Sequence, residues 1–262
     1  MPGVTKKPLS SAAFFVWPWC AKIETMGEVE FQVNRQSTLR VEVVGEEQTP
    51  VIVIDDFAVD TSRIIDYACD SASFGDDSTA AYPGVRAALT REHMIAQLDA
   101  LFPLLRRVYA VPDDLQMRPV NAVYSLVTTR EEDLRTLQRV PHIDSSKPYY
   151  MAITHYLGRG EFGGTGLYRH KPTGFETITE DRLSAYIKAG DAFLAAHGEP
   201  EQRYFGGSDD HYELFDCIDY RPNRLVAYPG YLLHSGLVDP ARDIDPDPRT
   251  GRLTSNVFVD FS

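Results

Sequence analysis

Cysteine is scarce in this chain of 262 residues. It has three, Cys20, Cys69 and Cys217, and no CxxC pair. An odd and dispersed set argues against a disulfide framework and against a zinc cage. Long apolar runs are lacking too, since no stretch reaches the roughly 18 apolar residues that a membrane-spanning helix requires. These absences favour a cytoplasmic protein with no membrane partner.

Basic residues are also under-represented, with 26 Lys and Arg against 38 Asp and Glu and a net charge of -12. A protein that binds phosphate backbones needs an excess of basic residues, so no nucleic-acid partner is expected. Hydrophobic residues make up 43% of the chain, which is enough to bury a sizeable core. The length suits one large domain or two small ones.

The first 25 residues stand apart. Lys6 and Lys7 precede an apolar run over residues 12–20, which faintly resembles a signal peptide. Pro18 interrupts that run, however, and no Ala-x-Ala-like cleavage site follows. We expect residues 1–25 to be disordered or loosely packed, with Met26 as an alternative start, and residues 26–262 to form a single domain.

The first half of that domain predicts helices between a few strands. We expect a hairpin of residues 29–34 with 38–44, a buried strand over 50–57 and a long loop over 73–88. Asp60 or Thr61 is a candidate cap for a helix that runs to Ser71. Thr90 begins a second helix, in which Pro103 should cause a kink or a break. Its apolar residues recur at spacings of three and four and predict packing on a sheet: Met94, Leu98, Leu101, Leu105 and Val108.

From Pro119 onward short strands dominate. They are expected at 120–127, 149–157, 163–170, 212–218, 224–228, 232–234 and 253–261. One helix interrupts them, beginning at Thr179 and ended by Gly190, with an irregular loop over 193–210. Residues 175–210 are thus inserted between strands and are a candidate lid. Helices followed by clustered strands indicate an α+β fold with a β-sandwich or barrel.

The most informative short motif is His142-Ile143-Asp144. Residues i and i+2 of a strand point to the same face, so this pair can aim an imidazole and a carboxylate at one point. With a distant second histidine, the pair can cover one face of an octahedral metal and leave the other face open. The pattern is common, however: His197/Glu199 and His211/Glu213 repeat it, and a solvated pair is its ordinary interpretation.

His234 is the preferred second histidine, because it follows a buried strand and a Pro-Gly turn that can hold a side chain rigidly. A core histidine bonded to a backbone carbonyl is the alternative. The other histidines fit less well. His211 and His197 lie in predicted loops, His155 lies within a strand, His93 lies in the first turn of a helix, and His170 adjoins a turn.

In order along the chain, four segments resemble the iron(II)- and 2-oxoglutarate-dependent dioxygenases, within them the prolyl-4-hydroxylase-like branch. They are Asn-Ala-Val-Tyr at 121–124, His-Ile-Asp at 142–144, the strand, turn and histidine at 224–234, and the final strand at 252–258 with its R-x-S/T pattern. The resemblance covers residues 50–262. It implies a double-stranded β-helix, or jelly-roll, with the predicted helices packed on its major sheet. The insertion at 175–210 departs from the simplest members and puts prolyl specificity in doubt.

This resemblance implies specific roles. His142, Asp144 and His234 would bind Fe(II), and O2 and 2-oxoglutarate would be co-substrates. Arg252 would bind the far carboxylate of 2-oxoglutarate, since a guanidinium suits two-pronged pairing, with Thr254 adding a hydroxyl from the same strand face. Arg249 is the second choice. Tyr124 is a candidate further donor or, equally, a core tyrosine.

The expected reaction is hydroxylation, or desaturation or ring formation, with release of succinate and CO2. A small molecule, an amino acid or a peptide is the expected substrate. The loops 82–86, 128–141 and 175–210 would cover the mouth of the site, where specificity usually resides. Aromatic candidates for the pocket are Tyr149, Tyr150, Phe162, Tyr204 and Phe205.

Two other classes compete. One is a non-catalytic jelly-roll that binds or senses a ligand and keeps a structural metal; binding of 2-oxoglutarate discriminates it from the oxygenase. The other is a cupin-type metal enzyme without a co-substrate, which would not need Arg252 and Thr254 as a dicarboxylate clamp.

Overall fold

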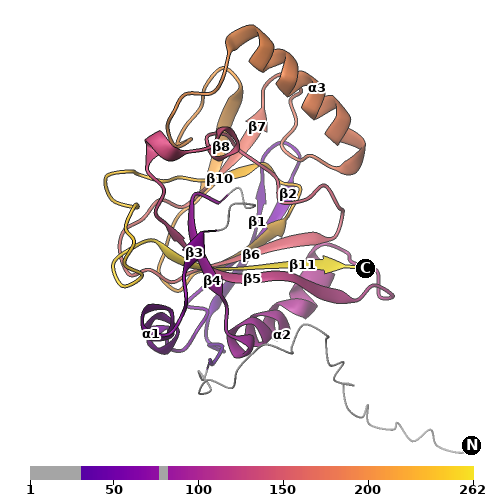
Figure 1. Cartoon of the computed structure of the whole chain (residues 1–262). Helices are drawn as coiled ribbons and strands as arrows, with labels where there is room; N and C mark the ends of the chain where they lie inside the picture. Colours follow the sequence, from indigo (N-terminus) through magenta and orange to yellow (C-terminus); the bar gives the residue numbers. More distant parts are fainter. Residues whose placement is uncertain (1–30, 77–81) are drawn as a thin grey trace, which may run out of the picture.

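A large antiparallel sheet forms the centre of the computed structural model, which describes residues 31–76 and 82–262 (Figure 1). Its strand order is β1 (Thr38–Val44), β2 (Thr49–Asp55), β9 (Leu225–Pro229), β6 (Tyr150–Tyr156), β11 (Leu253–Phe261), β5 (Met117–Val127), β4 (Gly84–Ala88) and β3 (Gly75–Asp76). A smaller antiparallel sheet has the order β10 (His234–Gly236), β7 (Thr165–His170) and β8 (Tyr212–Ile218). Both sheets are open at their edges.

Two helices cover one face of the large sheet (Figure 1). The α2 helix (Arg91–Val108) buries Leu98, Leu101 and Leu105 against apolar side chains of β2, β6, β9 and β11, as its apolar spacing predicts. It runs through Pro103 as one helix. Pro103 is exposed, so water can satisfy the backbone carbonyl one turn earlier that the proline cannot pair.

The α1 helix (Ser62–Asp70) packs beside α2 and follows its prediction closely. Ile64, Ile65 and Ala68 are buried against β4, β5 and β11. Thr61 occupies the N-cap position, and the Asp60 carboxylate accepts a hydrogen bond from the Ser62 N–H at 2.8 Å. Both expected cap residues therefore lie where the helix begins.

The opposite face of the large sheet packs against the small one. Val53, Tyr156 and Val226 of the large sheet form a buried cluster with Leu167 of β7 and Ile218 of β8. The chain is thus built in layers, with helices, the large sheet and then the small sheet. The α+β prediction is confirmed at this level.

Three expectations were wrong in detail. β1 pairs with β2 rather than with residues 29–34, and Val33 instead forms an isolated bridge with Ala58. The predicted loop 73–88 contains β3 and β4, because Gly84 and Arg86 pair with β5 and β3 despite turn-forming neighbours. The third helix, α3, spans Glu180–His197 and ends at Gly198, whose φ of 86° favours glycine.

Gly190 did not end α3 because it lies on an open side of that helix, with nothing within 4 Å of an added Cβ. Such a glycine costs only about 1 kcal/mol relative to alanine. The remaining connections include two short 3-10 turns, η2 (Glu131–Asp133) and η3 (Thr136–Gln138). The expectation for residues 1–25 lies outside the described residues. Among the described helices, none has both the length and the apolarity to cross a membrane.

Candidate metal centre

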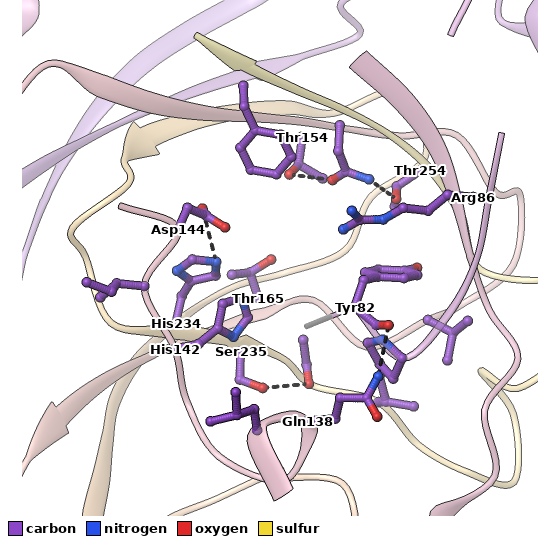
Figure 2. A pocket seen from close by; sticks show the side chains of 18 of the residues that line it. Tyr82, Arg86, Gln138, His142, Asp144, Thr154, Thr165, His234, Ser235 and Thr254 are labelled. Atoms are coloured by element: carbon purple, nitrogen blue, oxygen red, sulfur yellow. Dashed lines mark hydrogen bonds and ion pairs between the residues drawn. The ribbon is translucent and has the colours of Figure 1, made fainter. Parts of the chain in front are cut away.

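Backbone pairing brings the two predicted histidines together. His142 and His234 form an antiparallel β-bridge, in which the His142 N–H donates to the His234 carbonyl at 2.9 Å and the His234 N–H donates back at 3.0 Å. The Asp144 N–H donates to the carbonyl of Gly230 at 2.8 Å. These backbone hydrogen bonds attach the His-x-Asp segment to the turn and strand that carry His234. Figure 2 shows the side chains of His142, Asp144 and His234 close together.

The three side chains converge. One potential ligand atom from each of His142, Asp144 and His234 lies within 4.8 Å of the other two, and no other such group of three occurs in residues 31–76 and 82–262. His234 Nε2 is 3.6 Å from Asp144 Oδ2. His234 Nδ1 lies 2.9 Å from the Leu232 carbonyl and must be the protonated nitrogen to donate to it. The lone pair of His234 then resides on Nε2, which faces Asp144.

The electrostatics of the cluster favour a bound cation. Burial, with His234 and Arg86 nearby, lowers the pKa of His142 to about 3, so its imidazole is neutral at pH 7. Burial raises the pKa of Asp144, against the opposing influence of His234 and Arg86. Asp144 Oδ2 is buried and accepts no hydrogen bond from the described residues. A divalent metal fits this set, because it takes neutral imidazoles and gives the isolated carboxylate oxygen a partner.

The cluster opens into a cavity of about 460 Å³ between the two sheets. Alternate residues of β11 and the residue just before it line the large-sheet wall of the cavity, namely Arg252, Thr254, Asn256 and Phe258. This is the period-2 pattern of a strand with one face on a site. Arg252 and Thr254 therefore face the same space as the three potential metal ligands, as the sequence predicts.

Arg252 is 5% exposed, and the described residues supply no carboxylate partner for it. Its Nε donates to the carbonyl of Gly163 at 2.9 Å, and Nη2 is 3.3 Å from the carbonyl of Gly164. The buried Asp243 in turn accepts the Gly163 N–H at 2.9 Å. Its guanidinium also lies over the Tyr220 ring, 5.7 Å from the ring centroid. Carbonyl and aromatic contacts do not neutralise a guanidinium, so Arg252 can pair with an anionic ligand.

Tyr124 does not face this cavity. It is fully buried on the helix-covered face of the sheet, with Ile64 and Leu126 in its cluster. On β5, Ser125 pairs with Thr254 of the cavity wall, and its neighbour Tyr124 pairs with Ser255. Successive strand residues point to opposite faces, so the structure places Tyr124 as a core tyrosine, away from the cavity that Arg252 and Thr254 line. Arg249 is also remote, because it is 56% exposed and pairs with Asp70 at the surface.

The rival histidines lie elsewhere. His170 and His211 contact each other through their Nε2 atoms at 2.9 Å beneath α3. His197 ends α3 and stacks on Phe193. His93 and His155 are buried on the helix-covered face, next to Phe31. None of them joins a third potential ligand in the described residues.

Several lining residues were not singled out as ligands in the sequence. Tyr228 lies beside His234, with ring centroids 4.9 Å apart, and Arg86 lies over the Tyr82 ring at 5.1 Å. Figure 2 shows Arg86 across the cavity from Asp144. The cavity-facing position of Asn256 could have been predicted, since Asn256 follows Arg252 and Thr254 at the same two-residue spacing. Arg86 was expected only within the mouth loop 82–86, because its strand resembled a loop.

The three expected mouth segments contribute unequally. Tyr82, Pro83 and Arg86 line the cavity, as do Leu137, Gln138 and Val140. From residues 175–210 only Tyr204 does so; α3 lies on the far side of the small sheet (Figure 1). Of the other aromatic candidates Tyr150 lines the cavity, whereas Tyr149 and Phe205 pack in apolar clusters and Phe162 packs edge-on against Tyr220.

Comparison with known proteins adds a family but no function. A family model described as a family of unknown function, DUF6445, matches residues 35–259. No curated protein matches the chain.

Proposed function

The chain belongs to the family of unknown function DUF6445, and we propose that it is an iron(II)- and 2-oxoglutarate-dependent dioxygenase of the hydroxylase type. One observation carries the proposal. A His-Asp-His cluster with an isolated carboxylate oxygen and a buried arginine without a carboxylate partner line the same cavity. The first group suits a divalent metal, and the second suits an organic acid.

The donor set favours iron over a structural zinc. Two imidazoles and one carboxylate leave coordination positions open, whereas structural zinc sites are closed by four protein ligands and are rich in cysteine. The two described cysteines, Cys69 and Cys217, are not part of the cluster. When bound, iron and 2-oxoglutarate would supply the oxidising chemistry, with succinate and CO2 as by-products.

The protein's own contribution is ligation, orientation and exclusion of water. Leu232 fixes the His234 ring through Nδ1, and the β-bridge between His142 and His234 fixes the distance between their backbones. Arg252 would pair with the far carboxylate of the co-substrate, and Thr254 would donate its hydroxyl to the same group. The apolar side chains Val238 and Phe258 would keep this part of the cavity dry.

The substrate would occupy the part of the cavity bounded by Tyr82, Arg86 and Gln138. A second guanidinium in this region favours a small molecule, amino acid or peptide with an anionic group. Asp144 is the only acid that lines the cavity in the described part of the chain.

The proposal includes a double-stranded β-helix core. Its support is the stacking of two antiparallel sheets, with the candidate ligands between them and helices on the outer face of the larger sheet. The order of the motifs along the chain supports it as well.

The test is 2-oxoglutarate turnover with and without added Fe(II). We expect iron-dependent release of succinate in air, which His142→Ala abolishes. His197→Ala is the matched control, because His197 also precedes an acid by two residues but lies at the end of α3, and it should retain activity. Tight 1:1 metal binding without any effect of 2-oxoglutarate would refute the oxygenase and favour a non-catalytic binding module.

A further inference from the structure

The edge strand β1 carries an apolar stripe on its surface. Leu39, Val41 and Val43 are 46%, 44% and 57% exposed. They alternate along the strand and so share one face. β1 ends the large sheet, and its other edge pairs with no described strand. Proteins usually protect such edges with charge, proline, bulges or short length, since an open regular strand recruits another strand.

Other exposed edges in the described residues have these protections, and β1 lacks most of them. β3, at the opposite end of the large sheet, has two residues. β8, at an edge of the small sheet, carries exposed Asp216 and a register shift opposite Leu167 and Tyr168. β1 has seven residues that pair with β2 in an unbroken register. It is the edge best suited to extend the sheet.

The other face of β1 alternates in charge. Arg40 Nε lies 2.5 Å from Glu42 Oε1, and their side chains are 35% and 40% exposed. Arg40 also reaches Asp55, through Nη1 at 2.6 Å. From Leu39 to Val43, the side chains of β1 are therefore apolar, cationic, apolar, anionic and apolar in turn.

This pattern is complementary to itself in one antiparallel register. A two-fold axis perpendicular to the sheet keeps each side chain on its own face. Directly opposed residues must then be an even number of positions apart in the sequence, so the axis lies level with one residue, which faces its own copy. An axis at Val41 places Leu39 opposite Val43 of the second copy and Arg40 opposite Glu42 of the second copy. An axis at Arg40 or at Glu42 would place like charges directly opposite, which is destabilising.

We propose that β1 pairs antiparallel with β1 of a second copy of this chain, centred on Val41, so that the two large sheets become one continuous sheet. The apolar stripes meet on the α2 side, where Leu39 and Val41 neighbour the core residues Ile54 and Ile52. Arg40 keeps Asp55 and gains Glu42 of the second copy. This interface lies outside the cavity, so it holds whether or not the proposed oxygenase activity does.

A register-specific cross-link tests the pairing. Directly opposed residues have Cα atoms about 4.5–5.5 Å apart, within the range of a disulfide. We expect Val41→Cys to form a covalent dimer with the mild oxidant diamide, and Leu39→Cys alone to form none. A mixture of Leu39→Cys and Val43→Cys proteins should cross-link only as the mixed pair. The wild type, with its own three cysteines, is the background control.

Sedimentation equilibrium tests the charge pattern. The wild type should sediment as a concentration-dependent dimer. Glu42→Arg should weaken the dimer at least tenfold, because it sets cations against cations, while circular dichroism shows an unchanged fold. Glu132→Arg is the matched control, since it makes the same charge change at an exposed residue outside β1, in the 3-10 turn η2. A monomeric wild type, a dimer insensitive to Glu42→Arg, or cross-linking through Leu39→Cys alone would each overturn the proposal.

Discussion

Replacing Asp144 by asparagine should stabilise the metal-free protein while it removes metal binding. The Asp144 side chain is 15% exposed, and its Oδ2 accepts no hydrogen bond from the described residues. An asparagine amide at that position has an N–H to offer His234 Nε2, 3.6 Å away, whose lone pair is free because Nδ1 donates to Leu232. The substitution thus turns an isolated charge into a paired neutral group.

The magnitude follows from the cost of an unsatisfied buried polar atom, about 1–3 kcal/mol. Asp144→Asn should raise the free energy of unfolding by that amount at pH 7 in the presence of a chelator. Each kcal/mol shifts the Tm of a domain of this size by about 2–4 °C. Thermal unfolding followed by circular dichroism is sufficient to measure it.

Added metal should make the wild type more stable than Asp144→Asn. A ligand present at about a hundred times its Kd stabilises the folded state by about 2.7 kcal/mol. We therefore expect Fe(II), added anaerobically, or Mn(II) as a redox-stable substitute, to raise the Tm of the wild type and not that of Asp144→Asn. A variant that is less stable than the wild type without metal, or that retains the metal-dependent shift, would refute the argument for Asp144 as a ligand.

Four further predictions follow from particular residues. Arg252→Gln should weaken 2-oxoglutarate binding about ten- to hundredfold in calorimetry while metal affinity stays unchanged, because a charge-assisted pair is worth about 1.5–3 kcal/mol. Tyr124→Phe should leave that binding unaltered, since the hydroxyl lies on the other face of the sheet; a loss would restore it as a ligand. Burial lowers the pKa of His155 from 6.5 to about 4, so the unfolded chain binds more protons between these values and stability falls as pH drops through that window. Between pH 7 and 4.5 the wild type should lose about 2–3 kcal/mol of unfolding free energy through His155, as measured by urea unfolding. His155→Gln should lack this part of the loss, and an unchanged pH dependence would contradict the prediction. Leu101→Ala should cost about 2.7–5 kcal/mol by leaving a cavity under α2, against less than about 1 kcal/mol for the more exposed Ile95→Ala.

Local sequence patterns predicted the elements whose own residues define them. The apolar spacing of α2 and the continuous apolar run of β2 each point to one solution, because burial on one or both faces leaves that period in the sequence. The hairpin partner of β1 was wrong because the two competing connections, 35–37 and 45–48, are similarly short, so turn length does not choose between them. Residues 32–34 hydrogen-bond to residues 57–59 instead. β4 was missed because its strand is held by β5, which its own residues do not reveal.

The residues of the site likewise divide into those that local sequence signals predict and those that only tertiary structure places. The spacing of His142 and Asp144 and the turn before His234 are local signals, and their convergence required only that the two segments meet. Whether Tyr124 faces the site depends on strand pairing, which the sequence does not show. Ser125 lies opposite Thr254 of the cavity wall, so Tyr124 points to the other face of the sheet. Arg86 was expected only as part of a loop, 82–86, at the mouth of the site; its place opposite the cluster depends on the tertiary arrangement of β4, which local sequence does not show.

The measurement that tests the central claim most directly is an anaerobic titration of the Fe(II)-loaded protein with 2-oxoglutarate, followed by visible absorption. Chelation of the keto acid by an iron held through His142, Asp144 and His234 predicts a charge-transfer band. Arg252→Ala should shift the band to much higher 2-oxoglutarate concentration, whereas Arg249→Ala, which removes a surface arginine paired with Asp70, should leave the titration unchanged. Absence of the band from a protein shown to bind one iron would contradict the account.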